Sequence, residues 1–150
     1  MHRNFLKLFT IFVLGALIYG SLEVLARGFT HITMGLLGGF SMIVIHQSNT
    51  GRREGLNYFV QLFLITFFIT AIEFFSGEVF NVMLGMNIWD YSDMAINIDG
   101  QICMIYSLLW LVLAAIGIAF DDFIRWKLFR EDKNFSYIQL PAPGTSRRTG

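Results

Sequence analysis

Small and polar side chains recur at helical spacing in and just after the apolar run at residues 58–80. Steps of three or four residues place them on one helical face: Thr66, Thr70, Glu73, Gly77 and Asn81. Glu73 lies about 10 Å along a helix from the end of the run. A carboxylate at that depth costs about 2.5–3.5 kcal/mol on insertion scales, so Glu73 should face other helices and pair, bind a cation or carry a proton. The alternative is a structural role, in which the stripe holds helices together by hydrogen bonds.

The next segment, NIWDYSDMAINIDGQI at 87–102, carries acids and amides but no lysine or arginine. Its amides are spaced i, i+4 and are expected to re-enter the membrane on one face of the following helix. The predicted substrate- or ion-binding residues are Glu73, Asn81, Asp90, Asn97 and Gln101. The rings of this segment suit a membrane interface, and its predicted lid residues are Trp89, Tyr91 and Ser92. An aromatic anchor followed by a helix cap would explain the same residues.

Three further residues are assigned an accessory role near the same end of the predicted helices. Glu23 and Arg27 are spaced i, i+4, which also fits a plain salt bridge. His31 falls on the same predicted side as Glu73, so an acid–histidine cation site stays open as an alternative. No metal-ligand spacing marks such a site, the metal stays unknown, and no cofactor is predicted beyond a bound cation.

Composition indicates what must position these groups. The chain has 150 residues, 55% of them hydrophobic and only 15% charged, where a soluble domain is about a quarter charged. Continuous apolar runs cover about 5–22, 30–46, 58–80 and 98–120, which favours helices over barrel strands. We therefore predict an all-α, polytopic membrane protein with four transmembrane helices in a bundle over residues 1–133. An interfacial helix is expected at 121–130 and a flexible cytoplasmic tail at 134–150.

The cations are segregated along the chain. Ten of the eleven Lys and Arg residues fall on one side of a four-span arrangement, and Arg27 alone falls on the other. The positive-inside rule then places both termini in the cytoplasm of a cell-membrane protein, with the 78–99 loop facing outward.

Several function classes lack their signals. A formal net charge of zero gives no basic field for nucleic acid, so no nucleic-acid partner is predicted. The single Cys103 excludes a disulfide within the chain. The chain contains no P-loop, nucleophile elbow or H-E-x-x-H motif. Enzymatic activity is therefore uncertain, and a protein without such activity is favoured.

Two segments are similar to a known family: GFTHITMGLLGGFSMIVI at 28–45, and TAIEFFSGEVFNVMLGMNIWDYSDMAINIDGQICMIYSLLW at 70–110. They resemble the type IV ABC-transporter family, also called CmpB-like membrane proteins, over roughly residues 20–120. The resemblance implies a multi-span permease without naming a substrate. The early loop lacks the prolines common in that family, so the second span is expected to be built differently. Any ATPase would be a separate chain or another membrane subunit, and four spans would require a homo-oligomer in the lipid bilayer.

Three functions therefore stay open. The preferred one is a transporter or channel subunit with an intramembrane polar site that opens to the extracytoplasmic side, its substrate unknown. The second is a non-catalytic assembly or sensor subunit whose polar residues only fix helix pairing. The third is a membrane-embedded enzyme acting on lipid, in which Glu73 and Asp90 would form an acid–base pair.

Overall fold

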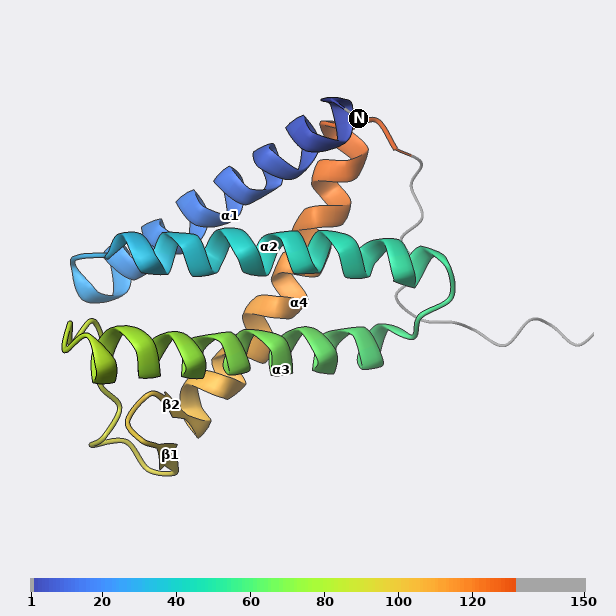
Figure 1. Cartoon of the computed structure of the whole chain (residues 1–150). Coiled ribbons are helices and arrows are strands. Elements are labelled where there is room, and N and C mark those ends of the chain that lie inside the picture. The colour runs from blue at the N-terminus through green and yellow to red at the C-terminus, as the bar shows by residue number, and fades with distance from the viewer. Residues whose placement is uncertain (1, 132–150) are drawn as a thin grey trace, which may run out of the picture.

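The structure, a computed structural model, describes residues 2–131, most of them in four helices (Figure 1). The helices are α1 (His2–Arg27), α2 (Ile32–Arg53), α3 (Tyr58–Gly77) and α4 (Met104–Lys127). A π-helix, η1 (Glu78–Met83), continues α3, and two short strands, β1 (Asn97–Ile98) and β2 (Ile102–Cys103), precede α4. The predicted tail at 134–150 lies outside the described residues.

The helices form an antiparallel arrangement in which α4 crosses α2 and α3 (Figure 1). α1 packs mainly along α2, and the start of α1 meets the segment after α4, where Lys7 pairs with Glu131. We call this the basic end, because Arg52 and Arg125 also lie there. The strands and η1 lie at the opposite end, which we call the hairpin end.

Helices α1 and α2 approach closely because glycines face bulky side chains. A Cβ atom on Gly39 would lie 2.6 Å from the ring of Phe12, and Gly38 lies directly against Tyr19. Because glycine has no side chain, the two helix backbones can approach closely at these positions.

Three helical segments are long and apolar enough to cross a membrane: Asn4–Arg27, Tyr58–Met83 and Met104–Lys127. Exposed apolar side chains such as Leu25 and Phe67 suit contact with lipid. α2 does not reach the same apolar composition, since its last two turns are polar and begin at His46. The prediction of a helical membrane protein is thus supported, and three of the four predicted spans correspond to helices of this kind.

The fourth predicted span begins later than expected, because residues 97–103 form a hairpin. Asp99 and Gly100 have φ of 49° and 67°, and Gln101 N–H donates to the Ile98 carbonyl at 3.0 Å, as in a type I′ turn. The prediction that Asn97 and Gln101 share a helical face is therefore wrong.

The predicted interfacial helix at 121–130 forms the end of α4 and is not a separate element. α4 continues without a break to Lys127, and Asp121 and Arg125 are buried against α2. The reason is a set of hydrogen bonds between α2 and α4 at the basic end, described below.

Candidate functional site

The centre of the candidate site is the buried carboxylate of Glu73 on α3, which is 2% exposed. Its Oε2 accepts a hydrogen bond from the Trp110 indole at 2.6 Å, and its Oε1 accepts one from the Tyr91 hydroxyl at 3.3 Å. Both donors are neutral, and Glu73 forms no ion pair with any residue that the structure describes. A buried carboxylate with only neutral partners is an attractive position for a cation or a proton.

Aromatic rings surround this carboxylate. Tyr91 stacks on Tyr106 with ring centroids 4.6 Å apart, and burial raises the pKa of Tyr91 well above its usual range. Its hydroxyl therefore stays protonated and can donate to Glu73. On the other side, Trp110 contacts Tyr19 with centroids 5.3 Å apart, and the Tyr19 hydroxyl donates to Glu23 at 3.2 Å. The rings thus connect Glu73 to Glu23 of α1.

The loop that carries Tyr91 is held down by Asn81 of η1. The Asn81 amide donates to the Trp89 carbonyl at 3.0 Å and to Gln101 Oε1 at 2.9 Å, and its oxygen accepts from the Ile88 N–H at 2.7 Å. The π-helix after Gly77 presents Asn81 to the loop, and such π segments are frequent at functional sites. Asn81 therefore shapes the loop rather than contacting Glu73.

Gln101 completes the same set of loop contacts. Its side-chain nitrogen donates to the Asp99 carbonyl at 2.9 Å, and its own carbonyl accepts from the Trp89 indole at 3.0 Å. A Cβ atom on Gly77 would lie 2.5 Å from Gln101 Oε1, so glycine is needed there for the hairpin to dock on α3.

The remaining predicted loop residues lie nearer the surface. Asn97 donates to the carbonyls of Met94 and Ser92 at 2.8 and 3.2 Å. Ser92 donates through its N–H and hydroxyl to Asp90 Oδ1 at 2.8 and 2.6 Å. These hydrogen bonds lower the pKa of Asp90, so its carboxylate is ionised at neutral pH.

A hollow of about 320 Å³, which we call the outer hollow, opens beside Tyr91, whose hydroxyl donates to Glu73. Charged groups from α1 and the loop line it together with aromatic rings: Glu23, Arg27, Trp89, Asp90, Tyr91 and Tyr106. Arg27 Nη2 donates to the Ile88 carbonyl at 2.8 Å, and its Nη1 lies 3.4 Å from Glu23 Oε2. Tyr91 therefore lies between the outer hollow and Glu73. The structure brings together Glu73, Tyr91, Glu23 and Arg27, and it adds Trp110, Tyr106 and Tyr19.

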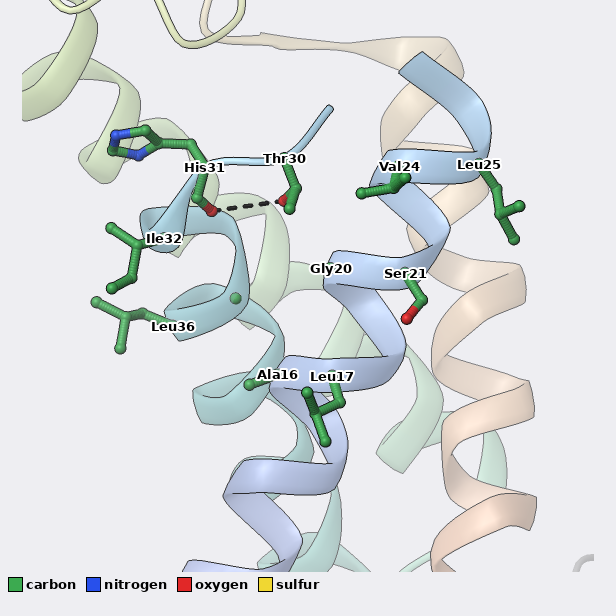
Figure 2. A pocket seen from close by; sticks show the side chains of 11 residues that line it. Ala16, Leu17, Gly20, Ser21, Val24, Leu25, Thr30, His31, Ile32 and Leu36 are labelled. Atoms are coloured by element: carbon green, nitrogen blue, oxygen red, sulfur yellow. Dashed lines mark hydrogen bonds between the residues drawn. The ribbon is translucent and has the colours of Figure 1, made fainter. Parts of the chain in front are cut away.

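His31 lies apart from this group. It is the N-cap of α2, where its Nδ1 accepts from Thr33 N–H at 3.3 Å. It also borders a larger hollow of about 650 Å³ between the end of α1 and the start of α2 (Figure 2). Leu17, Val24 and Leu36 line that hollow, and none of the described residues that line it is an Asp, Glu, Lys or Arg. Among residues 2–131, no three His, Cys, Asp or Glu side chains gather to hold a metal ion.

A second buried polar cluster lies at the basic end and was not expected from the sequence. Asp121, which is 0% exposed, accepts from His46 Nδ1 at 2.6 Å, Asn49 Nδ2 at 2.8 Å and Arg125 Nε at 2.9 Å. Asn49 accepts from Gln61 Nε2 of α3 at 2.5 Å. The cluster thus joins α2, α3 and α4.

Ion pairs extend this cluster to α1. Arg52 pairs with Asp122, and Glu131 pairs with both Lys7 and Arg125. Partial burial alone would raise the pKa of Glu131, but the hydrogen bonds and charges of Lys7 and Arg125 together lower it. The i, i+4 spacing of Asp121 and Arg125 was the sequence signal for this cluster.

The fold and the site define a polytopic helical membrane protein with a buried carboxylate beneath an aromatic-lined outer hollow. The model of the family described as "Putative ABC-transporter type IV" matches residues 10–138, and the chain belongs to this family. No curated protein and no solved structure matches the chain.

Proposed function

We propose that this chain is a subunit of a membrane transporter or channel whose polar site, centred on Glu73, binds a cation or a proton. The observation that carries the proposal is the absence of any ion pair to the buried Glu73 carboxylate among the described residues. Its two neutral donors, Trp110 and Tyr91, leave the negative charge uncompensated. A cation or proton would supply that compensation.

Tyr91 acts as the lid of this site. Its ring borders the outer hollow while its hydroxyl contacts Glu73, so a rotation of the ring would connect the two. Asn81 and Gln101 hold the lid loop in place through its backbone. Glu23 and Asp90 give the outer hollow an excess of negative charge over Arg27, which favours the approach of cations.

The outer hollow faces the extracytoplasmic side in this proposal, and both termini lie in the cytoplasm. The pairing of Lys7 with Glu131 is consistent with a fourth crossing made by α2, because it brings the start of α1 and the end of α4 to one side. Arg52, Arg53 and Arg125 lie at that same end, as the positive-inside rule requires of a cell-membrane protein.

The complete transporter contains more than one chain in this proposal. One small bundle offers a single set of site residues, so a homo-oligomer in the bilayer would complete the pathway. Because the chain has no P-loop, ATP hydrolysis, if it drives transport, belongs to a separate ATPase or another membrane subunit.

The experiment is a flux assay in proteoliposomes that compares wild type with Glu73→Gln. Proton and alkali-cation fluxes are followed with pH-sensitive and cation-sensitive dyes. Glu73→Gln is expected to abolish the flux while the protein still inserts, and the matched control Glu54→Gln, at an exposed residue of the basic end, is expected to leave it unchanged. Equal flux in wild type and Glu73→Gln would overturn the proposal.

A second candidate, an assembly or sensor subunit, is favoured by one observation. The polar groups of Asn81 and Gln101 are engaged in fixing the loop, as a purely structural role would require. In that case Glu73→Gln would lower stability without any flux to lose. The enzyme alternative is weaker, because Asp90 is exposed and held by Ser92, whereas Glu73 is buried.

A further inference from the structure

A third hollow lies deeper in the bundle than the outer hollow. This central cleft has a volume of about 280 Å³ between α1, α2 and α4. Its walls are almost wholly apolar and include Ile18, Met42, Leu113 and Ile116. Ile18 and Ile116 are 40% and 59% exposed, so the rim of the cleft is open to the surroundings of the bundle.

The outer hollow and the central cleft are one helical turn apart on two helices. On α1, Glu23 borders the outer hollow and Tyr19 borders the cleft. On α4, Tyr106 borders the outer hollow and Trp110 borders the cleft. The ring pair of Tyr19 and Trp110 forms the boundary between them.

The combined length of the two hollows matches one lipid molecule. From Tyr106 at the outer hollow to Phe120 at the foot of the cleft, α4 rises about 21 Å. Half of a bilayer with its headgroups is also about 20–22 Å thick. A polar head in the outer hollow would therefore leave its tail at the depth of the cleft.

The charges of the outer hollow select the head. Two carboxylates, Glu23 and Asp90, face one guanidinium, that of Arg27. Tyr91 and Tyr106 add aromatic faces, and aromatic faces attract ammonium groups. A zwitterionic head fits this set, with its ammonium near the carboxylates and rings and its phosphate near Arg27.

We propose that the outer hollow and the central cleft together bind one ammonium-bearing amphiphile, with its head among Glu23, Arg27 and Asp90 and its tail in the cleft. The inference rests on the proposed function, because the head of the amphiphile would occupy the outer hollow, which Tyr91 separates from Glu73. Trp110 contributes to both proposed sites, because it borders the central cleft and donates a hydrogen bond to Glu73.

The test titrates purified protein in a neutral detergent with single-chain lipids and measures binding by native mass spectrometry. The probes are lysophosphatidylethanolamine and lysophosphatidylcholine, which carry an ammonium, and lysophosphatidylglycerol, which does not. We expect about tenfold tighter binding of the ammonium lipids, and Glu23→Gln is expected to remove most of this preference. A preference for one ammonium lipid over the other identifies a primary or a quaternary head.

The position of the tail is tested by filling the cleft from its rim. Ile116→Trp and, from α1, Ile18→Trp are expected to weaken binding of both ammonium lipids about tenfold. The matched control Leu108→Trp, at an exposed α4 residue that does not border the cleft, is expected to bind as wild type does.

Equal binding of all three lipids, or unchanged binding in both cleft variants, would overturn the inference. The proposed function has a separate readout. If Glu73→Gln abolishes cation flux while no lipid preference exists, the cation site stands and the amphiphile inference fails. If lipids bind selectively but no flux depends on Glu73, the proposed function fails and the amphiphile site stands.

Discussion

Replacing Asp121 by asparagine tests whether the buried polar cluster at the basic end holds the bundle together. The carboxylate accepts three hydrogen bonds, from His46, Asn49 and Arg125, and it is the acidic centre of the cluster. Asparagine keeps the size of the side chain but removes the charge and one acceptor oxygen. The guanidinium of Arg125 then loses its ion pair with residue 121.

The expected loss follows from the surroundings of that charge. Removing one partner of a buried ion pair costs about 3–5 kcal/mol. The lower end applies here, because Glu131 still pairs with Arg125 at 2.9 Å and the new amide oxygen can still accept one hydrogen bond. A loss of about 3 kcal/mol corresponds to a fall in Tm of about 6–12 °C for a chain of this size.

The assay is thermal unfolding of purified protein in one detergent, with Asp93→Asn as the matched control. Asp93 is exposed, so its variant is expected to melt within about a degree of wild type. An Asp121→Asn protein as stable as wild type would refute the reasoning, since the cluster would then contribute no net stability beyond the cost of burying it.

Two further outcomes are expected. Asn81→Ala leaves the Ile88 N–H and the Trp89 carbonyl without their hydrogen-bond partner, which should lower the free energy of unfolding by about 2–4 kcal/mol. Hydrogen exchange at the Ile88 amide should become faster, and unchanged exchange would contradict the role of Asn81 in holding the loop. The lowered pKa of Glu131 implies stability that is present above the ordinary glutamate pKa of about 4.3 and is lost as pH falls through the lower folded value. Glu131→Gln carries no charge and cannot form the ion pair with Lys7, so it should remove this loss of stability at low pH. Melting curves recorded at falling pH measure the loss, and the same pH profile in wild type and Glu131→Gln would contradict the pairing.

The apolar runs of the sequence predicted the helices well, because length and composition are what a bilayer selects. The interior position of Glu73 also follows from the cost of facing lipid with a carboxylate. The polar end of α2 was harder to interpret, since His46 and Asn49 find their partner Asp121 more than 70 residues away. Such long-range pairs leave no periodic pattern in one chain.

The hairpin was missed for a different reason. Asp99-Gly100 is a strong local signal for a type I′ turn, but the apolar run that surrounds it was interpreted as one continuous helix. A helical interpretation placed Asn97 and Gln101 on one face, whereas the turn sends Gln101 toward Gly77 and leaves Asn97 near the surface. The π-helix that presents Asn81 has no comparable sequence signal.

The most direct test of the cation site is the thermal stability of wild type and Glu73→Gln across pH and a panel of monovalent and divalent cations. If the site binds a cation or a proton, one of these conditions raises the Tm of wild type and leaves that of Glu73→Gln unchanged. If no condition separates the two proteins, and Glu73→Gln simply melts earlier throughout, Glu73 is a structural residue and the proposed function is wrong.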